Sequence, residues 1–364
     1  MTTYLLAGGG TAGHVNPLLA VADRIRRDEP ESTILVLGTA EGLESRLVPD
    51  RGYELLTVER LPFPRRPGRA LLRFPSRQRA AIARVRAILR DNGVDVVVGF
   101  GGYAAAPAYL AAHREKVPFV VHEANARPGL ANRLGASFTP FVGVAHRATR
   151  IRHAHFVGMP LRREIEQLDR PAARAEACVV FGLHPSAPVL LVTGGSTGAR
   201  RINATISAAA PLVIGSGWQL LHIAGERAEV RDPHLDGYTF LNYCDRMDLA
   251  IAVADLAVSR SGSATVSELT AVGVPAVYVP YPVGNGEQRF NAADAVAAGG
   301  AVIVDDAEFT PRWVAETLVP LLQDRALIAE MAVGSASVGV SDGADRMVAL
   351  VHRALGRQSP TPAT

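Results

Sequence analysis

A carboxylate with the chemistry to recognise hydroxyl groups lies within residues 259–291. Glu268 falls in the first turns of a helix that is predicted to start near Ser263 and to end before Gly273. A carboxylate at that place can accept two hydrogen bonds from the hydroxyl groups of a ribose. Thr265 and Glu268 also have the spacing of a capping box, and the local sequence does not choose between the two roles.

Two amide side chains, Gln288 and Asn291, follow in the same stretch. We predict a buried strand over residues 276–281 and a helix over residues 287–298, in which side chains three apart share one face. Amides both donate and accept hydrogen bonds, as sugar hydroxyls require, although solvated surface amides are the commoner case. The order loop, helix, strand, loop, helix is typical of an α/β sheet that binds a phosphorylated ligand at the carboxyl ends of its strands.

His14 ends a glycine loop, GGGTAGH, that follows a strand predicted at residues 4–7. Asn16 and Pro17 are typical of a helix start, which puts the positive end of a helix dipole beside the imidazole. A neutral imidazole at that place can take a proton near neutral pH. From this loop alone, a histidine that only bonds the turn backbone is the slightly favoured interpretation.

The glycines of this loop match the dinucleotide fingerprint GxGxxG from Gly8 to Gly13, which is a weak signal by itself. A dinucleotide site also needs an acidic residue at the end of the second strand, which we predict at residues 33–37. Residues 38–40 are Gly, Thr and Ala, and Glu41 comes only after them. The sequence therefore disfavours NAD binding.

Three more predicted strands run into polar or glycine-rich motifs: residues 94–98 into GFGGY, residues 118–121 into HEAN, and residues 189–192 into GGSTGA. His122, Glu123 and Asn125 then stand at the carboxyl end of a strand, where function is favoured over packing. Ser196 is expected to cap the helix after GGSTGA, whose glycines clear the approach of a phosphate. Each half of the chain thus begins with a strand, a glycine loop and a helix.

Composition limits the size of the fold and its cellular setting. With 364 residues, 48% of them hydrophobic, the chain is long enough for two domains with separate cores. The two cysteines, Cys178 and Cys244, indicate a reducing compartment without a disulfide framework. The sequence has no spaced Cys/His cluster for zinc and no apolar run of bilayer length, and its start reads as a strand, not a signal peptide. We expect a soluble cytoplasmic protein that can rest on a membrane.

Residues 60–90 hold ten arginines and no acidic residue, whereas the whole chain carries a formal charge of only +3. Prolines break the first part into a loop, and apolar residues alternate with arginines in the predicted helix that follows. A basic amphipathic helix of this kind can bind anionic lipid headgroups. A solvated helix face is the alternative, and RNA binding is less favoured because no nucleic-acid motif accompanies the charge.

The motifs GGTAGH, GFGGY, HEAN, GMPLR, GGSTGA and SRSGSATVSE with GNGEQRFNA occur in one order over most of the chain, from Leu5 to Val304. This ordered set resembles the MurG family of glycosyltransferase family 28, which uses UDP-GlcNAc and lipid I in peptidoglycan synthesis. The resemblance implies an α/β GT-B fold of two Rossmann-like, doubly wound parallel-sheet domains with an interdomain cleft. It implies an acceptor and membrane domain over 1–157, joined by a C-terminal helix at 340–356, and a UDP-GlcNAc-binding domain over 158–339.

The resemblance also implies the roles of single residues. His14 becomes the base for the acceptor's 4-hydroxyl in an inverting transfer, which reverses the preference drawn from its loop alone. Glu268 would bind the ribose, Gln288 and Asn291 the GlcNAc hydroxyls, and the Ser196 loop the diphosphate. Arg162 and the backbone near Cys244 would border the uracil. The full implied donor site is Thr11, Ala12, Gly13, Asn125, Arg162, Ser196, Cys244, Arg260, Ser263, Ala264, Thr265, Glu268, Gln288 and Asn291.

The implied partners are UDP-GlcNAc, the undecaprenyl-linked acceptor lipid I and an anionic membrane surface, with peripheral attachment to the cytoplasmic face of the cell membrane and no nucleic acid. The expected membrane contacts are Arg69, Leu72, Arg73, Phe74 and Arg77. No metal or other cofactor is expected in the catalytic step, because helix N-termini and arginines can carry the diphosphate charge and the sequence has no Asp-x-Asp motif.

Some positions depart from the commonest family pattern: Glu287 stands where a glutamine is frequent, HEAN replaces HEQN and GMP replaces GNP. Four alternatives stay open on the sequence. They are another GT-B enzyme such as a secondary-metabolite glycosyltransferase, a UDP-GlcNAc 2-epimerase, a non-catalytic UDP-sugar sensor, and an NAD oxidoreductase.

Overall fold

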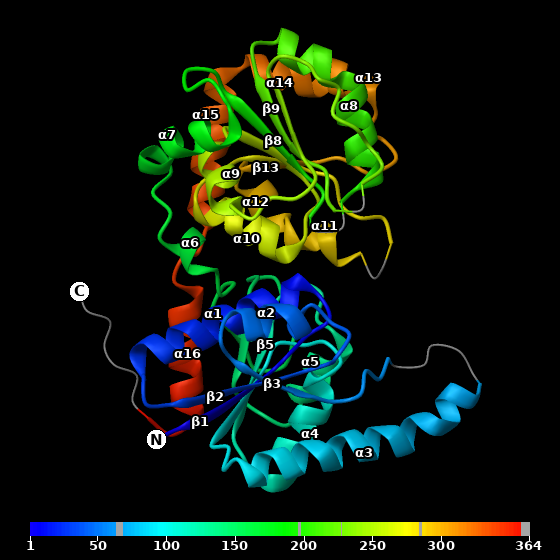
Figure 1. The fold of residues 1–364 in the computed structure, drawn as a ribbon, viewed down its shortest axis with the longest axis vertical. Coiled ribbons are helices and arrows are strands. Elements are labelled where there is room, and N and C mark those ends of the chain that lie inside the picture. The colour runs from blue at the N-terminus through cyan, green and yellow to red at the C-terminus, as the bar shows by residue number, and fades with distance from the viewer. Residues whose placement is uncertain (63–67, 196–197, 227, 284–285, 358–364) are drawn as a thin grey trace. The chain divides into compact units, whose positions relative to one another are not determined.

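The computed structural model describes residues 1–62, 68–195, 198–226, 228–283 and 286–357 (Figure 1). The chain forms two compact units: unit 1 comprises Met1–Arg162 and Asp342–Thr364, and unit 2 comprises Arg163–Ser341. The first boundary thus falls five residues after the position that the motif pattern indicated, and the last helix belongs with unit 1.

Unit 1 contains a seven-stranded sheet in which every strand runs parallel to its neighbours. Its strands are β1 (Thr3–Ala7), β2 (Thr33–Gly38), β3 (Glu54–Thr57), β4 (Val96–Gly99), β5 (Phe119–Glu123), β6 (Val142–Val144) and β7 (Ala154–Phe156). The order is β3-β2-β1-β4-β5-β6-β7, so the strand order reverses between β1 and β4. Its helices are α1 (Ala12–Asp28), α2 (Glu44–Asp50), α3 (Arg69–Asp91), α4 (Ala105–Glu115), α5 (Leu130–Gly135) and α16 (Gly343–Ala354).

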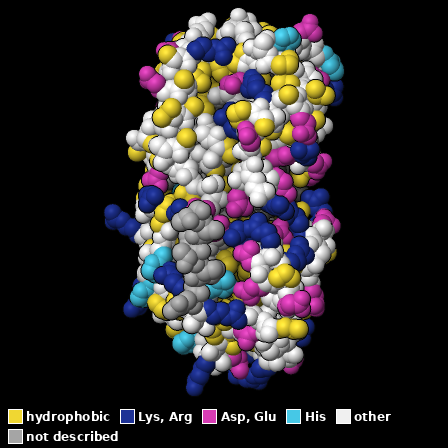
Figure 2. Space-filling view, turned by 90° about the vertical axis from the view of Figure 1, so that its left-hand side faces the viewer, with side chains coloured by type: hydrophobic (Ala, Val, Ile, Leu, Met, Phe, Trp, Pro, Cys, Tyr) yellow, Lys and Arg dark blue, Asp and Glu magenta, His cyan; other side chains and the backbone are white. Residues whose placement is uncertain are grey.

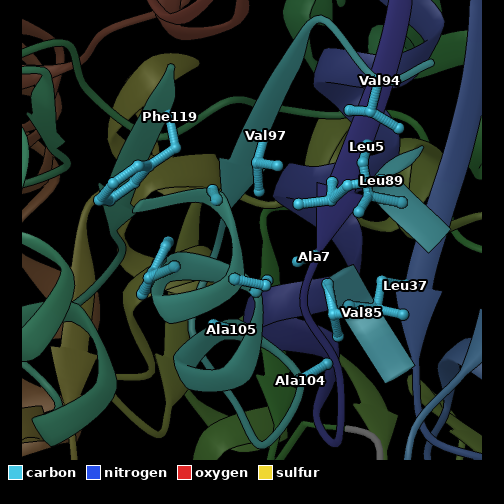
Figure 3. Packing of buried hydrophobic residues seen from close by; sticks show 14 of the residues in the cluster. Leu5, Ala7, Leu37, Val85, Leu89, Val94, Val97, Ala104, Ala105 and Phe119 are labelled. Atoms are coloured by element: carbon cyan, nitrogen blue, oxygen red, sulfur yellow. The ribbon is translucent and has the colours of Figure 1, made fainter. Parts of the chain in front are cut away.

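Both faces of this sheet are covered by helices, which explains why its central strands are apolar at successive positions. Side chains alternate between the faces along a strand, so Leu5 and Ala7 of β1 enter one buried cluster and Tyr4 and Leu6 the other. Figure 3 shows the first cluster, where Leu5 lies near Leu89 of α3. The second cluster includes apolar residues of α1 and α16.

Helix α16 brings the C-terminal part of the chain back onto the start of unit 1. Nε2 of His352 lies 2.7 Å from Oε1 of Glu29, and the hydroxyl of Tyr4 donates to the other oxygen of that carboxylate at 2.8 Å. This contact joins positions 323 residues apart in the sequence. The helix is therefore part of unit 1 through polar contacts as well as through its apolar face.

Unit 2 repeats the architecture with a six-stranded parallel sheet. Its strands are β8 (Val189–Thr193), β9 (Gln219–Ile223), β10 (Tyr238–Leu241), β11 (Leu256–Ser259), β12 (Ala276–Tyr278) and β13 (Ala301–Ile303). The order β10-β9-β8-β11-β12-β13 reverses between β8 and β11. The helical elements are α6 (Arg163–Glu166), α7 (Arg170–Phe181), α8 (Arg200–Gly215), α9 (Met247–Val253), α10 (Ser263–Ala271), α11 (Glu287–Asn291), α12 (Ala293–Ala297), α13 (Pro311–Trp313), the π-helix η1 (Val314–Leu318), α14 (Val319–Gln323) and α15 (Arg325–Val338).

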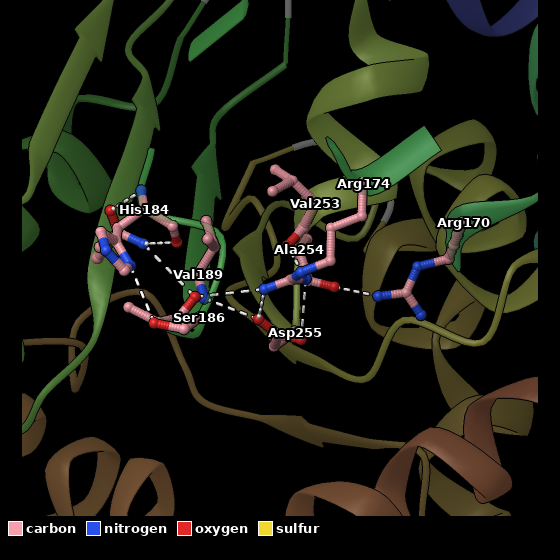
Figure 4. Close-up of polar contacts among 10 residues, drawn as sticks. Arg170, Arg174, His184, Ser186, Val189, Val253, Ala254 and Asp255 are labelled. Atoms are coloured by element: carbon pink, nitrogen blue, oxygen red, sulfur yellow. Dashed lines mark hydrogen bonds and ion pairs between the residues drawn. The ribbon is translucent and has the colours of Figure 1, made fainter. Parts of the chain in front are cut away.

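An ion-pair network fastens the amino ends of the two central strands of unit 2 to α7 (Figure 4). Asp255, directly before β11, accepts from Nη2 of Arg174 at 3.1 Å and from the backbone N–H of Val189 at 2.8 Å. Arg174 also donates to the carbonyl of Val253 at 2.9 Å, and Arg170 donates to the carbonyl of Ala254. The amino edge of this sheet is thus occupied by structural contacts, which leaves its carboxyl edge for loops that can bind a ligand.

Four predicted elements differ from the structure by more than two residues or by a break, whereas several strand ends differ by one or two residues. Helix α1 begins at Ala12 rather than at Asn16, because a helix can include Pro17 near its start at the loss of one hydrogen bond. Strand β12 ends at Tyr278 instead of residue 281, since Pro280 has no N–H for the ladder.

The predicted helix 287–298 is two short helices that meet at Ala292, and α16 begins at Gly343 instead of residue 340 because Gly339 ends α15. Among the helices of the described residues, none combines the length and apolarity needed to cross a bilayer.

Candidate active site

In unit 1, the loops that follow β1 and β4 pack backbone to backbone. These strands are neighbours at the point where the strand order reverses, which is where α/β sheets bind their ligands. Gly102 has a φ of +79°, and a Cβ at this position would lie 2.4 Å from the carbonyl oxygen of Gly9. Only glycine allows the two loops to approach this closely.

His14 is half-buried in the first turn of α1. Its Nδ1 lies 3.2 Å from the carbonyl oxygen of Gly9 and 3.3 Å from Oγ1 of Thr11. Because a carbonyl oxygen can only accept, the contact with Gly9 requires the proton on Nδ1 and leaves Nε2 as the proton acceptor. A Cβ at Gly101 would lie 3.1 Å from Nε2, so glycine at this position leaves room for the ring. His14 therefore bonds the turn backbone and still keeps one nitrogen for chemistry.

Burial lowers the pKa of His14 below its ordinary value of 6.5. Three groups oppose this effect by favouring the charged ring: the carboxylates of Glu123 and Glu44 and the carbonyl of Gly9. The net shift is downward, so the imidazole is neutral at pH 7 and Nε2 carries a lone pair. Its place in the first turn of α1 acts in the same direction, since the positive end of a helix dipole disfavours an imidazolium.

The first two side chains of the HEAN motif, at the end of β5, form hydrogen bonds with backbone groups instead of pointing into solvent. His122 is fully buried, with Nε2 3.2 Å from the carbonyl of Gly158, and burial lowers its pKa to about 4. The buried carboxylate of Glu123 accepts from the backbone N–H groups of Asn125 and Gly129, at 2.8 and 2.9 Å. The strand-end position of His122 and Glu123 therefore serves packing and loop anchoring. Asn125 is half-buried on the loop that Glu123 holds.

Glu44, the first residue of α2, is a polar group of this region that the sequence analysis missed. Its side chain is fully buried beneath the loop after β1, where Oε2 accepts from the backbone N–H of Gly10 at 2.7 Å. Oε1 accepts from the backbone N–H and the hydroxyl of Thr39, at 2.9 and 2.8 Å. A dinucleotide site needs an acidic residue directly after β2; Glu41 is the first acidic residue there, but the buried glutamate is Glu44, three residues further on. The only sequence signal is its position among glycines, in GTAEGLE.

In unit 2, α10 begins at Ser263 and its last residue is Ala271, as predicted, and Gly262 is the N-cap residue. Thr265 and Glu268 both lie inside the helix, so they do not form the capping box that the sequence left open. Ser263 and Ala264 complete the first turn with Thr265, and Glu268 is half-buried one turn further on. Because α10 follows β11 after three residues, the backbone N–H groups of its first turn lie at the carboxyl edge of the sheet.

Arg260, between β11 and α10, has its guanidinium engaged within unit 2. Nη1 lies 2.6 Å from Oδ1 of Asp306 and donates to the carbonyl of Val279 at 2.9 Å and to that of Pro280 at 3.2 Å. The side chain is largely buried, and its guanidinium carbon lies 5.4 Å from the ring centre of Tyr281, within the range of a cation–π contact. Arg260 therefore fastens the segment after β12 to the start of α10.

The two amides of the GNGEQRFN motif have different surroundings. Asn291 is 1% exposed, and its Nδ2 donates to the carbonyl of Ser261 at 3.2 Å, which ties α11 to the loop after β11. Gln288 is half-buried, and its Oε1 accepts from the backbone N–H of Tyr281 at 2.8 Å. The shared face expected for the pair therefore contacts the loops around the carboxyl ends of β11 and β12.

The loop after β8 contains Ser196, which lies outside the described residues. The prediction that Ser196 caps the following helix is wrong, because α8 begins at Arg200 with Ala199 as its N-cap residue. The residue before this N-cap, Gly198, has a φ of +76°. A Cβ at Gly198 would lie 2.3 Å from the carbonyl oxygen of Ala224, so the loop packs closely against that carbonyl. That carbonyl accepts from Nδ2 of Asn203 at 2.9 Å.

The remaining predicted positions are Arg162, Cys244 and three residues at the start of α1. Arg162 is half-buried at the end of the first segment of unit 1, and Cys244 is buried and forms no disulfide with Cys178, which is also buried. Thr11 is exposed, and Ala12 and Gly13 are half-buried at the start of α1. Within the described ranges, no group of three His, Cys, Asp or Glu side chains is arranged to hold a metal ion.

Two doubly wound parallel-sheet units, each with a glycine loop where its strand order reverses, define the GT-B class of glycosyltransferase fold. Residues 4–143 match the glycosyltransferase family 28 N-terminal domain, and residues 189–347 match the family 28 C-terminal domain. The chain belongs to glycosyltransferase family 28.

Two relatives of high sequence identity carry the same name. The chain is 65% identical, over 98% of its length and 99% of the relative, to the UDP-N-acetylglucosamine--N-acetylmuramyl-(pentapeptide) pyrophosphoryl-undecaprenol N-acetylglucosamine transferase of Leifsonia xyli subsp. xyli. It is 60% identical to the protein of the same name from Clavibacter sepedonicus, over 100% of this chain and 99% of that one.

Among solved structures, Acinetobacter baumannii MurG matches with a TM-score of 0.77 and 26% identity, over 97% of this chain and 100% of that chain. UDP-GlcNAc 2-epimerase from Neisseria meningitidis matches with a TM-score of 0.69 and 15% identity, over 97% and 100% of the two chains. The second likeness shows a shared fold only.

Proposed function

We propose that this protein transfers N-acetylglucosamine from UDP-GlcNAc to the 4-hydroxyl of MurNAc in lipid I, which yields lipid II for peptidoglycan synthesis and cell-wall growth. The observation that carries the proposal is the 65% identity, over nearly the whole length of both chains, to a relative named for this transfer. The placement of a neutral imidazole at the strand-order reversal of unit 1 supports it, because such a transfer needs a base for the acceptor hydroxyl.

In the proposed step, the acceptor oxygen forms a bond to C1 of GlcNAc while the bond from C1 to the UDP oxygen breaks. UDP leaves with the electron pair, the proton of the acceptor hydroxyl passes to Nε2 of His14, and the configuration at C1 inverts. Unit 1 supplies the base, and unit 2 supplies the donor site. In that site Glu268 binds the ribose, Gln288 and Asn291 the sugar, and the loop with Ser196 the diphosphate.

The other donor contacts belong to the same proposal. Arg162 and the backbone near Cys244 border the uracil, with Arg260 near them. Ser263, Ala264 and Thr265 offer the N–H groups of a helix start to negative charge. The proposed donor contacts that belong to unit 1 are Thr11, Ala12, Gly13 and Asn125. We propose that these groups carry the diphosphate charge without a metal, so transfer should continue at an unchanged rate in excess EDTA.

Helix α3 is the proposed membrane contact, at the cytoplasmic face of the cell membrane. Figure 1 shows its N-terminal turns projecting beyond the sheet, and Leu72 in those turns is 82% exposed. Arg73 is exposed and Phe74 half-buried beside it, whereas the side chain of Arg69 lies outside the described residues. Basic and acidic side chains are interspersed over the face drawn in Figure 2, whereas residues 60–90 hold ten arginines and no acidic residue, so this segment is a local feature of the chain.

Some arginines of this segment have carboxylate partners within unit 1. Nε of Arg77 donates to Glu59 at 3.2 Å, and Nε of Arg90 donates to Glu115 at 2.8 Å. Replacement of Arg73 and Leu72 by Glu should therefore weaken binding to vesicles of anionic lipid more than Arg90→Glu does, while transfer to a soluble acceptor is retained. Equal vesicle binding by all variants in a sedimentation assay would rule out α3 as the contact.

Transfer itself is tested with purified protein, radiolabelled UDP-GlcNAc and a short-chain lipid I analogue. We expect a labelled disaccharide product only when both substrates are present. Formation of UDP-ManNAc without an acceptor would instead indicate an epimerase. Binding of UDP-GlcNAc without any turnover of either kind would indicate a sugar-nucleotide sensor, and either result would overturn the proposal.

A further inference from the structure

A single peptide group connects Glu44 with His14. The carbonyl of Gly9 and the N–H of Gly10 belong to the same peptide bond. The carbonyl lies 3.2 Å from Nδ1 of His14, and the N–H donates to Oε2 of Glu44 at 2.7 Å. The carboxylate, the peptide and the imidazole thus form a continuous chain of hydrogen bonds, although Glu44 and His14 come from different helices.

The surroundings of Glu44 leave its carboxylate little freedom. A Cβ at Gly9, Gly38 or Gly42 would lie 2.2, 2.5 or 2.0 Å from an atom of this side chain, so three glycines enclose it. Its two oxygens accept three hydrogen bonds, and the donors are two backbone N–H groups and one hydroxyl rather than a Lys or Arg side chain. A carboxylate that is buried without a cation is costly unless donors surround it, so its position is determined by the loop that it holds.

We propose that Glu44 is a positioning residue that orients and polarises His14 through the Gly9–Gly10 peptide. A carboxylate that accepts from a peptide N–H draws electron density toward the carbonyl oxygen of that peptide, which becomes a stronger acceptor. The stronger carbonyl holds the proton on Nδ1 of His14 and makes Nε2 more basic. The same relation exists where a carboxylate contacts the Nδ1–H of a catalytic histidine directly, but here a peptide group stands between the two. This inference rests on the proposed role of His14 as the base.

Other titratable groups also act on His14 and must be separated from Glu44. The carboxylate of Glu123 on β5 favours the charged ring, as does Glu44. His122, also on β5, is kept neutral by burial, which lowers its pKa to about 4. Glu123 holds the loop after β5 and Glu44 holds the loop after β1, so a change at Glu44 leaves the hydrogen bonds of Glu123 intact.

The decisive variant is Glu44→Gln, which keeps the shape of the side chain and removes its charge. In glutamine, an NH₂ group replaces one of the two carboxylate oxygens. This NH₂ group cannot accept from a backbone N–H, so the hydrogen bond from Gly10 or the one from Thr39 is lost. We expect kcat to fall about 10- to 100-fold with little change in the KM for UDP-GlcNAc. Loss of the negative charge lowers the pKa of His14, so the acidic limb of the kcat profile should move to lower pH. Glu44→Asp keeps the charge and should leave that limb nearer to its original position.

The matched control is Asp23→Asn, which removes a carboxylate of α1 that binds Tyr53 at 2.7 Å and Arg51 at 2.5 Å but does not contact the glycine loop. Asp23→Asn should lower the free energy of unfolding but should not shift the acidic limb of the profile of kcat against pH. If Glu44→Gln is folded and has the original kcat and pH profile, or only loses activity in parallel with Asp23→Asn, the proposal is wrong.

A measurement on the unaltered protein covers the case in which Glu44→Gln does not fold. Nitrogen-15 chemical shifts of the His14 ring should show the proton on Nδ1, and an Nε2–H tautomer would overturn the proposal. This readout needs no substrate. A protein with the expected tautomer but without transfer activity would contradict the proposed function. It would not contradict the hydrogen-bonded connection from Glu44 through the Gly9–Gly10 peptide to His14.

Discussion

The two glycine loops of this molecule share a topology but differ in the charge beneath them. In unit 1, the buried carboxylate of Glu44 holds the loop after β1. In unit 2, a neutral amide fastens the loop after β8, because Asn203 donates to the carbonyl of Ala224, against which Gly198 packs. His222 lies behind Asn203, with Nε2 3.1 Å from its Oδ1, and burial lowers the pKa of this histidine to about 4. The unit 2 support is therefore uncharged at neutral pH.

This difference agrees with the proposed division of roles. A negative charge beneath the loop of His14 favours the imidazolium that forms when the base takes a proton. The same charge beneath a loop that binds a diphosphate would repel the ligand, so a neutral network suits that place better. One strand–loop–helix topology can thus serve a base or an anion, and the buried group below the loop determines which.

The largest effect is expected from His14→Ala, which removes the base from the loop of unit 1. We expect kcat to fall by about two to four orders of magnitude, since a positioned base contributes that much. The affinity for UDP should change little, because the diphosphate site lies in unit 2 by our proposal. Steady-state kinetics and calorimetric titration with UDP measure the two quantities. Equal losses in both would contradict the assignment of base and donor site to different units.

A smaller but substantial effect is expected from Gly102→Ala, which pushes the loop after β4 against the loop of His14. The new Cβ would lie 2.4 Å from the carbonyl oxygen of Gly9, in addition to the strain of a φ of +79°. The control is Gly93→Ala, where φ is +57° and nothing lies within 4 Å. We expect Gly102→Ala to lower the free energy of unfolding by about 1–3 kcal/mol more than the control. Identical denaturation curves would show that the loops do not pack as described.

Asn203→Asp would introduce into unit 2 the kind of charge that unit 1 has. The carboxylate replaces the Nδ2 that donates to Ala224, so a buried carbonyl loses its donor and a negative charge approaches the loop. We expect the Kd for UDP to rise about tenfold, which corresponds to about 1.4 kcal/mol. Asn203→Ser, which carries no charge, should have a weaker effect. If both variants bind UDP as the original protein does, the charge beneath this loop is irrelevant.

The last prediction concerns a property that the two units share, a buried neutral histidine. The pKa values of His122 in unit 1 and His222 in unit 2 are lowered from 6.5 to about 4. The unfolded chain therefore binds protons at these sites before the folded chain does. The free energy of unfolding should fall as the pH drops from 6.5 toward 4. Urea denaturation across this range measures the slope, and His222→Asn should make it shallower. A slope that is unchanged by this variant would contradict the contribution of His222.

Local patterns determined the framework of this protein. The runs at residues 94–98 and 189–192 predicted β4 and β8, because both faces of each sheet are covered and consecutive residues are therefore apolar, apart from Asp95 before β4 begins. Alternation of strands with helices then predicted two doubly wound units, and this fold class is confirmed. The glycine motifs placed the loops correctly, since the backbone conformations that they require are a property of the residue type.

Only the tertiary structure decided which groups lie behind those loops. Glu44 contacts Gly10 across 34 positions of sequence, and His122 contacts Gly158 across 36, because the order of strands in the sheet brings their loops together. Periodicity and turn composition report on neighbours within a few residues, whereas the partner of a buried charge depends on which loops become adjacent after folding. The sequence therefore identified His14 and its loop, and the fold supplied the carboxylate that holds them.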